Sequence, residues 1–410
     1  MEADLREIVI NKIDMSKDIS DEEISQITDE IIFKYGKEYC LSAKDKFKLH
    51  RGILDSIRGL DILEEVLGDE EITEIMINGY DNIFIEKKGI LTNYDGKFSS
   101  KDKLLNIIQQ IVANVNRRVN ESSPIVDSRL KDGSRVNIVL NPIALDGPVV
   151  TIRKFPKKSI TMDNLIEWGT LTREVADFLR ILVVAGYNIF ISGGTGSGKT
   201  TFLNVLSNYI PSDERVITIE DSAELQLQNI PNLVRLESRP PNDEGENEIS
   251  IRQLIRSSLR MRPDRIVVGE VRGGEAMDML QAMNTGHDGS LSTGHANSPE
   301  DMLKRLETMV LMGVDIPISA IKGQISAGID IIVHLSRLRD KSRKITEIIE
   351  VCGMEEGEIK VNSLFKFHEY SSNNKVINGG LDWTGNGLIN TTKLLNAGYD
   401  KEAYLYGQRD

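Results

Sequence analysis

Hydrophobic and polar residues follow three successive patterns along the 410-residue chain. Over residues 1–67, charges are frequent and apolar residues recur at helical spacing, so that the isoleucines of DEEISQITDEIIFKYG share one helix face. From Glu71 the period changes to two, and β-branched residues alternate with polar ones between turn signals at Asn78-Gly79 and Lys88-Gly89. The first pattern predicts a small helical segment, and the second predicts a meander of strands.

The second pattern predicts an α+β domain over residues 68–155. A helix is expected at about Lys101–Arg117, and further strands are expected in GSRVNIVL and PVVTIRKF. The next segment, PKKSITMDN, is polar and begins with Pro156, which predicts an extended linker over residues 156–164.

The third pattern, over residues 165–410, alternates short β-type runs with helical stretches. The β-type runs are NIFISGG, RVITIED, RIVVGEV and GSLSTGH. Such alternation predicts an α/β domain with a mostly parallel sheet and helices on both of its faces. A charged, hairpin-like stretch, IIVHLSRLRDKSRKITEIIEV, follows these runs, and the tail beyond it is weakly patterned.

Charge and cysteine content limit the classes of function. The formal net charge is -13 and aromatic residues make up 5% of the chain, which argues against stable nucleic-acid binding through phosphate neutralisation and base stacking. Cys40 and Cys352 stand far apart without a metal-ligand spacing, so neither a disulfide framework nor a zinc site is predicted. No apolar run approaches the roughly 20 residues that span a bilayer, and a cytoplasmic protein is expected.

The segment YNIFISGGTGSGKTTFLNVL reads as a strand, a glycine-rich loop and a helix. It matches the phosphate-binding form G-x-x-x-x-G-K-[ST] in the context that this motif requires. The glycines let backbone N–H groups turn towards phosphates, Lys199 supplies a cation, and the Thr200 hydroxyl is a ligand for Mg²⁺. The predicted site for ATP and Mg²⁺ therefore comprises Gly193, Thr195, Gly196, Ser197, Gly198, Lys199, Thr200 and Thr201.

Acidic residues follow two of the predicted strands. Glu270 comes after RIVVG, and Glu220, Asp221 and Glu224 follow VITI. Because the carboxyl ends of parallel strands meet at one edge of a sheet, Glu220 and Glu270 are expected beside the phosphate loop. There they would hold Mg²⁺ or orient the attacking water, although ordinary strand-end acids are the alternative. Two carboxylates beside one phosphate loop predict nucleotide hydrolysis.

His295 lies in GSLSTGHANSPEDMLKRLE, just before a helix that Ser298 is expected to cap, with Pro299 in its first turn. Its imidazole is expected to donate a hydrogen bond to the γ-phosphate. A purely structural hydrogen bond is the alternative, because that is the commoner role of a lone histidine. The other histidines, His334 among them, have a weaker case or none.

Four segments occur in a fixed order: GGTGSGKTT, IEDSAEL, LRMRPDRIVVGEVRGGEAMDMLQAMNTGHDGS and STGHANSPEDMLKRLE. They resemble the Walker A, Asp box, Walker B and His box of ATPases of the type II and type IV secretion superfamily. The resemblance is strongest to the CpaF-type ATPases of tight-adherence (Flp) pili, and it covers about residues 58–370. Gly294 departs from the family pattern, in which a valine is commoner.

The resemblance implies a homohexameric ring whose RecA-like C-terminal domain hydrolyses ATP at the inner face of the cell membrane. Hydrolysis would drive pilin insertion into, or extraction from, the membrane through inner-membrane platform proteins. By position, Glu220 belongs to the Asp box, Glu270 is the Walker B acid and His295 is the His box histidine.

Two arginines of the preceding domain complete the implied site. Arg135 in GSRVNIV and Arg153 in TIRKF match arginines that approach the γ-phosphate in the related type IV secretion ATPases. An arginine that stabilises the charged transition state is a common part of phosphoryl transfer, so ATP is expected to clamp the two domains together. Exposed strand arginines are the alternative. A conjugation-type secretion ATPase, which exports protein or DNA, uses the same motifs and is the alternative to a pilus motor.

Overall fold

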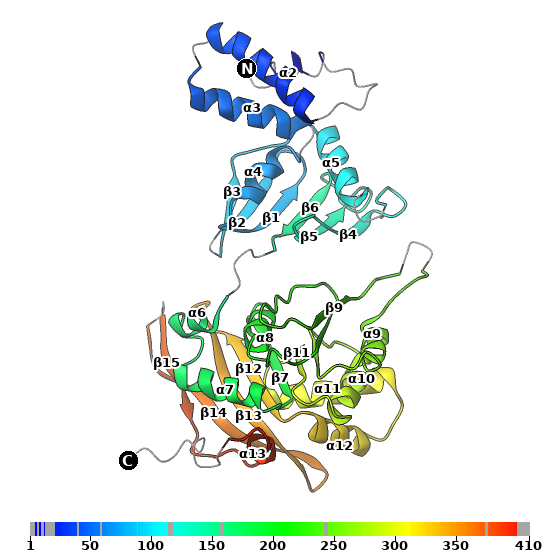
Figure 1. The fold of residues 1–410 in the computed structure, drawn as a ribbon, viewed down its shortest axis with the longest axis vertical. Helices are drawn as coiled ribbons and strands as arrows, with labels where there is room; N and C mark the ends of the chain where they lie inside the picture. Colours follow the sequence, from blue (N-terminus) through cyan, green and yellow to red (C-terminus); the bar gives the residue numbers. More distant parts are fainter. Residues whose placement is uncertain are drawn as a thin grey trace. The chain divides into compact units, whose positions relative to one another are not determined.

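The computed structural model describes most of the chain and divides it into two compact units, residues 1–158 and 159–410. Figure 1 shows the ribbon of each unit. The described residues are 21–38, 41–57, 60–87, 89–113, 118–155, 160–241, 245–373 and 376–399, together with Leu5, Ile8, Val9 and Lys12.

The first unit begins with two helices, α2 (Asp21–Glu38) and α3 (Ala43–Ile57), which pack against each other. Ile24 and Ile31 of α2 and Ile53 of α3 are buried in the small core between them. The isoleucine face read from the sequence is therefore the buried face of α2.

The rest of this unit is an antiparallel sheet in the order β3-β2-β1-β6-β5-β4. Helices α4 and α5 share one hydrophobic core with its strands. The predicted meander of strands corresponds to β1, β2 and β3, whereas Lys88 and residues 114–117, at the end of the predicted helix, lie outside the described residues. The elements are α4 (Ile62–Gly68), β1 (Ile72–Asn78), β2 (Ile83–Lys87), β3 (Ile90–Tyr94), α5 (Lys101–Ala113), β4 (Ile125–Arg129), β5 (Arg135–Val139) and β6 (Val149–Arg153).

The described part of the second unit begins with a short helix, α6 (Met162–Glu167). Thr161 Oγ1 accepts the backbone N–H of Asn164 at 3.3 Å, and the Asn164 side chain accepts the N–H of Thr161 at 3.1 Å. This reciprocal cap satisfies N–H groups at the start of the helix. The prediction of an extended linker as far as residue 164 is therefore wrong for its last three residues, and residues 156–159 lie outside the described part.

Among the described residues, the second unit forms a nine-stranded sheet in the order β15-β14-β13-β12-β7-β11-β10-β8-β9. The strands from β12 to β9 in this order are parallel, and β13, β14 and β15 extend the sheet as antiparallel strands. The elements are α7 (Arg173–Val184), β7 (Ile189–Gly193), α8 (Lys199–Ser207), β8 (Val216–Glu220), β9 (Leu233–Glu237), α9 (Ile251–Ser258), β10 (Arg265–Val268), α10 (Glu275–Asn284), β11 (Leu291–His295), α11 (Pro299–Gly313), α12 (Ile318–Gly328), β12 (Ile331–Arg337), β13 (Arg343–Glu355), β14 (Glu358–Asn373), β15 (Val376–Trp383) and α13 (Thr392–Asn396).

Helices cover both faces of this sheet, as the sequence predicts (Figure 1). Ile189 and Ile191 of β7 belong to a core shared with α6, α7 and α8, whereas Phe190 between them belongs to a core shared with α9, α10, α11 and α12. This alternation follows from the period of two along a strand. None of the helices formed by the described residues combines the length and the apolar character of a membrane span.

Candidate nucleotide-binding site

The phosphate-loop motif forms a tight turn between β7, which ends at Gly193, and α8, which begins at Lys199. Gly196 and Gly198 have φ values of 70° and 97°, a left-handed conformation that glycine adopts at little cost. A Cβ atom on Gly193 would lie 2.3 Å from the carbonyl oxygen of Leu335 on β12. Glycine is therefore required where the loop leaves the sheet, and the backbone can approach a phosphate closely.

The ammonium of Lys199 points back into this loop, and the residue is only 7% exposed. Its Nζ donates a hydrogen bond to the carbonyl oxygen of Gly194 at 3.0 Å and lies 3.3 Å from His295 Nδ1. Burial lowers the pKa of Lys199, and the nearby Glu270 opposes this shift. Among the described residues, no carboxylate lies within ion-pair distance of Nζ. A buried cation without an anionic partner is costly, and it is typical of a site built for a phosphate.

Glu270 and His295 meet beside the loop, at the carboxyl ends of β10 and β11. His295 Nε2 lies 3.0 Å from Glu270 Oε1, yet the pair does not have hydrogen-bond geometry. Arg272, which sequence reasoning did not single out, donates to Glu270 Oε2 at 2.8 Å. Burial, followed by the charge of Lys199, lowers the pKa of His295 below its usual 6.5, so the imidazole is neutral at pH 7. A neutral ring carries one N–H that can be donated to a phosphate oxygen.

Glu220 lies at the end of β8, next to the segment that carries Glu270. A Cβ atom on Gly269 would lie 2.9 Å from Glu220 Cγ. Glu220 is 3% exposed, and its Oε2 accepts the backbone N–H groups of Glu224 at 2.8 Å and Leu225 at 3.0 Å. Burial raises the pKa of Glu220, while these two hydrogen bonds oppose the shift. One carboxylate oxygen is thus used to shape the loop after β8, and the other is left for a ligand.

Buried polar atoms around the loop indicate what the site would accept. Ser197 Oγ, Glu220 Oε1 and Glu270 Oε1 are buried, and none has a hydrogen-bond partner among the described residues. Those residues contain no group of three or more His, Cys, Asp or Glu side chains arranged for a metal ion. Protein sites for Mg²⁺ commonly use only one or two carboxylates together with phosphate oxygens and water. The two unpartnered carboxylate oxygens therefore fit Mg²⁺ that is bound together with a nucleotide.

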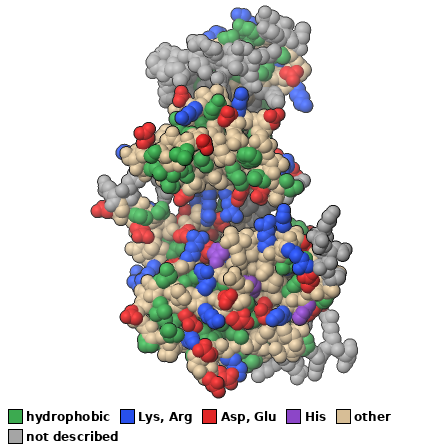
Figure 2. All heavy atoms as spheres, turned by 180° about the vertical axis from the view of Figure 1, so that it is seen from behind, with side chains coloured by type: hydrophobic (Ala, Val, Ile, Leu, Met, Phe, Trp, Pro, Cys, Tyr) green, Lys and Arg blue, Asp and Glu red, His purple; other side chains and the backbone are tan. Residues whose placement is uncertain are grey.

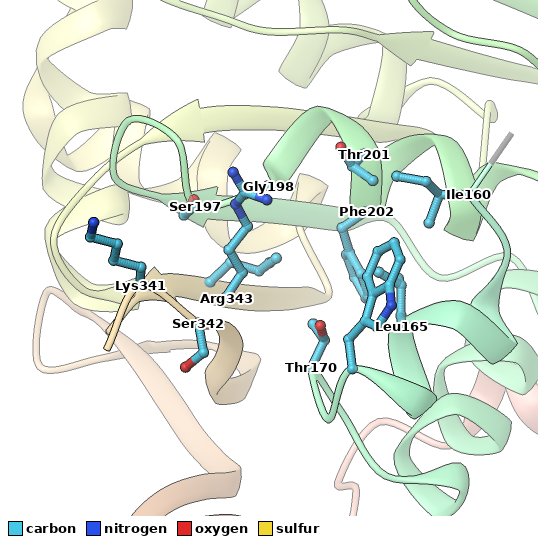
Figure 3. Close-up of a pocket in the computed structure, with 12 residues that line it drawn as sticks. Ile160, Leu165, Thr170, Ser197, Gly198, Thr201, Phe202, Lys341, Ser342 and Arg343 are labelled. Atoms are coloured by element: carbon cyan, nitrogen blue, oxygen red, sulfur yellow. The ribbon is translucent and has the colours of Figure 1, made fainter. Parts of the chain in front are cut away.

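A cavity of about 240 Å³ opens beside the phosphate loop (Figure 3). Ser197, Gly198 and Thr201 line it from the loop and the first turn of α8, and the apolar side chains of Ile160 and Leu165 also line it. Thr200 stands in the first turn of α8 beside Thr201, whereas Thr195 is exposed in the loop. The cavity continues from the phosphate-binding backbone into an apolar space, which suits the sugar and base of a nucleotide. The loop motif predicted Ser197, Gly198 and Thr201, whereas no sequence pattern indicated that Ile160 and Leu165 would line the same cavity, because they lie outside the motif.

The model of the type II/IV secretion system protein family matches residues 57–374. The chain belongs to this family. It is 33% identical over 302 residues to the type IV secretion system protein PtlH of Bordetella pertussis, covering 68% of this chain and 89% of PtlH. It is 32% identical over 309 residues to the conjugal transfer protein TrbB of Rhizobium radiobacter, covering 75% of this chain and 91% of TrbB.

The fold is similar to that of a solved ATPase. The X-ray structure of the Legionella pneumophila ATPase DotB matches with a TM-score of 0.52 and 22% identity, over 72% of this chain and 80% of that chain. The predicted RecA-like α/β fold is confirmed, and membership of the family supports ATPase activity. These relatives are named for conjugal transfer and type IV secretion, so the narrower CpaF-type assignment stays a prediction.

Gly294, the departure from the family pattern, is explained by packing. A Cβ atom at this position would lie 3.0 Å from Phe190 Cε1 and 3.0 Å from Met302 Cε. A valine would need both side chains to move, because 3.0 Å is well inside van der Waals contact. In this member of the family, the space beside β11 is filled by Phe190 and Met302 instead.

The two predicted arginines of the first unit lie side by side on neighbouring strands. Arg135 on β5 is the cross-strand partner of Arg153 on β6, and Arg129 on β4 is the partner of Arg135 on its other side. Arg153 Nε lies 3.6 Å from Glu74 Oε1 on β1. Like charges directly opposite each other destabilise a sheet, and Glu74, which is the cross-strand partner of Arg153 on its other side, offsets part of this repulsion. Whether Arg135 and Arg153 reach the γ-phosphate stays a prediction.

His334, to which the sequence assigned no role, contacts the strand that leads into the phosphate loop. It lies on β12, is 4% exposed, and its Nδ1 shares a hydrogen bond of 2.8 Å with Oγ of Ser192, the residue before Gly193. The backbone of Asn297, two residues after His295, raises the pKa of the ring against the lowering caused by burial. His334 thus links the strand that feeds the loop to the segment that carries His295. The sequence held no signal for it, because β7 and β12 are distant along the chain.

Proposed function

We propose that this protein is a Mg²⁺-dependent ATPase that powers a type IV secretion apparatus of the conjugation type. The observation that carries this proposal is the buried Lys199 ammonium, which lies inside a glycine loop next to Glu270 and His295 and has no carboxylate partner among the residues that the structure describes. The family match and the names of PtlH and TrbB support a transport role. Assembly of a Flp-type pilus is the second candidate, favoured by the sequence resemblance to CpaF-type ATPases.

In this proposal each residue of the site has a separate task. The loop backbone and Lys199 bind the phosphates, and Thr200, Glu220 and Glu270 would hold Mg²⁺, which supplies charge neutralisation when bound. Glu270 also orients the attacking water, and the neutral His295 donates its N–H to the γ-phosphate. Arg135 and Arg153 are proposed to stabilise the charge that develops in the transition state.

The catalytic assignment is tested by Glu270→Gln, with Glu275→Gln as the matched control. Glu275 Oε1 accepts the N–H groups of Arg272 and Gly273 at 2.7 and 2.9 Å, and a glutamine can keep both hydrogen bonds. The Glu270 variant is expected to bind ATP normally and to lose about 10²- to 10³-fold in turnover. Equal phosphate release by wild type and the Glu270 variant would show that Glu270 has no catalytic role.

The transport assignment needs an assay in cells. A strain that lacks the protein is complemented with wild type or with the Glu270→Gln variant. Restoration of DNA transfer or protein export by wild type alone supports the secretion motor, whereas restoration of surface pili alone supports the pilus motor. If neither process depends on the protein, both candidates are wrong.

We further propose that the protein acts as a homohexamer with membrane-bound partners at the inner face of the cell membrane. Hydrophobic side chains gather on the surface of the first unit (Figure 2). The exposed large hydrophobic residues of this unit include Ile90, Leu91, Ile143 and Leu145. Exposed apolar surface is typical of association surfaces. Light scattering with a non-hydrolysable ATP analogue is expected to show hexamers, and a monomer at every concentration would contradict this.

A further inference from the structure

The turn between β12 and β13 brings a group of cations to the phosphate loop. Arg337 ends β12, Lys341 lies in the turn with a φ of 68°, and Arg343 begins β13. Arg343 Nε donates a hydrogen bond to the carbonyl oxygen of Gly196 at 3.0 Å. Lys341 and Arg343 also line the cavity beside the loop, where Figure 3 shows the Arg343 side chain next to Gly198.

Arg337, Lys341 and Arg343 differ from their neighbour in the same turn, which has an acidic partner. Arg339 forms a bidentate pair with Glu369 of β14, with one contact at 2.9 Å. Within the described part of the chain, no carboxylate lies at ion-pair distance from Arg337, Lys341 or Arg343. The chain as a whole carries a net charge of -13, so acidic residues are abundant. Cations left unpaired at the edge of a cavity favour an anionic ligand.

The position of Arg343 identifies the part of the nucleotide that it would reach. Lys199 and the first turn of α8 are placed for the β- and γ-phosphates, and the apolar cavity is placed for the sugar and base. Arg343 stands where the two regions join, because its Cδ would lie 3.4 Å from a Cβ atom on Gly198. The phosphate between the sugar and the β-phosphate is the α-phosphate.

The C-terminal strand holds this turn in place. Asp340 Oδ1 accepts the N–H and the hydroxyl of Ser342 at 3.0 and 2.6 Å, and its Oδ2 accepts the N–H of Ile377 on β15 at 2.9 Å. These hydrogen bonds lower the pKa of Asp340 to about 2, so the carboxylate is ionised at neutral pH. The family match ends at residue 374, so β15 lies beyond the matched residues, and its hydrogen bond to Asp340 fixes the turn beside the loop.

We propose that Arg343 is a nucleotide-binding residue that contacts the α-phosphate, and that β15 positions the turn that carries it. The proposal rests on the nucleotide-binding function proposed above. On binding, the guanidinium forms charge-assisted hydrogen bonds to phosphate oxygens in addition to, or in place of, its bond to the Gly196 carbonyl. A contact to the α-phosphate is the same in AMP, ADP and ATP, which distinguishes it from the contacts of Lys199.

The test compares the dissociation constants of AMP, ADP and ATP for wild type, Arg343→Ala and Arg343→Lys. Arg339→Ala is the matched control, because it removes an arginine of the same turn that is paired with Glu369. Loss of Arg343 is expected to raise the dissociation constants of all three nucleotides by the same factor, about ten- to a hundredfold. The lysine variant should recover part of the loss, and the control should bind as wild type does.

Wild-type affinity of Arg343→Ala and Arg343→Lys for ADP and ATP would overturn the inference. A loss confined to ATP would also overturn it, because it would place Arg343 at the γ-phosphate. If an alanine variant is poorly folded, the lysine variant decides between these outcomes. Failure of the wild-type protein to bind any of the nucleotides would instead contradict the proposed function itself, so the two failures are distinguishable.

Discussion

Replacement of Lys199 by methionine is expected to separate nucleotide binding from folding stability. The ammonium is buried, its hydrogen bonds go to the Gly194 carbonyl and His295, and burial lowers its pKa. Burying a cation without a carboxylate partner costs free energy of folding, and the unbranched methionine side chain fills a similar volume. Without nucleotide, the variant is therefore expected to unfold at the same temperature as wild type or at a higher one.

Nucleotide should stabilise the wild type and have little effect on the variant. A ligand present at 100 times its dissociation constant stabilises the folded state by about 2.7 kcal/mol. The unit that carries the phosphate loop spans residues 159–410, and for a unit of this size the gain corresponds to a rise in Tm of about 5 to 10 °C. Lys199→Met should lose most of this rise, because the cation that binds the β- and γ-phosphates is absent.

Thermal unfolding followed by circular dichroism, with and without ADP and Mg²⁺, checks both halves of this prediction. Lys360→Met is the matched control, because it also removes a lysine cation but at a place away from the loop. Lys360 Nζ pairs at 2.9 Å with Glu355, the last residue of β13, whereas Arg343 beside the loop is the first. The control should show the full rise in Tm. The reasoning is refuted if Lys199→Met unfolds several degrees below wild type without nucleotide, or if it keeps the full rise with nucleotide.

Two further predictions concern buried charges in the same unit. Asp278→Asn is expected to lower the free energy of unfolding, measured by urea denaturation, by about 1–3 kcal/mol, because Asp278 is 3% exposed and pairs with Arg252 at 2.7 Å and Arg256 at 2.6 Å. The side chains of the two arginines are 33% and 56% exposed, so water can solvate them in the variant, which limits the loss. An unchanged denaturation midpoint would contradict this prediction. Burial lowers the pKa of His334 below 6.5, so the unfolded chain binds the proton more readily, and stability is expected to fall as the pH drops below about 6.5. His334→Gln should reduce this dependence on pH, and an unchanged slope of stability against pH would show that His334 does not contribute to it.

The elements that could be predicted are those whose signals are contiguous in the sequence. The strand, loop and helix around Gly193 and Lys199 follow from an apolar run, a glycine spacing and a helical period that lie within 20 residues of one another. Glu220 and Glu270 could be placed at one edge of the sheet because parallel strands that alternate with helices share the direction of their carboxyl ends. The isoleucine face of α2 follows from its own periodicity.

Only the tertiary structure decided which distant segments support the site. The strand β12 pairs with β7 although more than a hundred residues separate them in the chain, and this pairing places His334 opposite Ser192. The pairing of β13 with β12 then brings Arg343 to the carbonyl oxygen of Gly196. The edge strand β15 has a weakly patterned sequence, and its conformation depends on hydrogen bonds with β14. A residue's own neighbours determine its local conformation, whereas the packing of non-local strands determines what its side chain meets, and no local pattern encodes that partner.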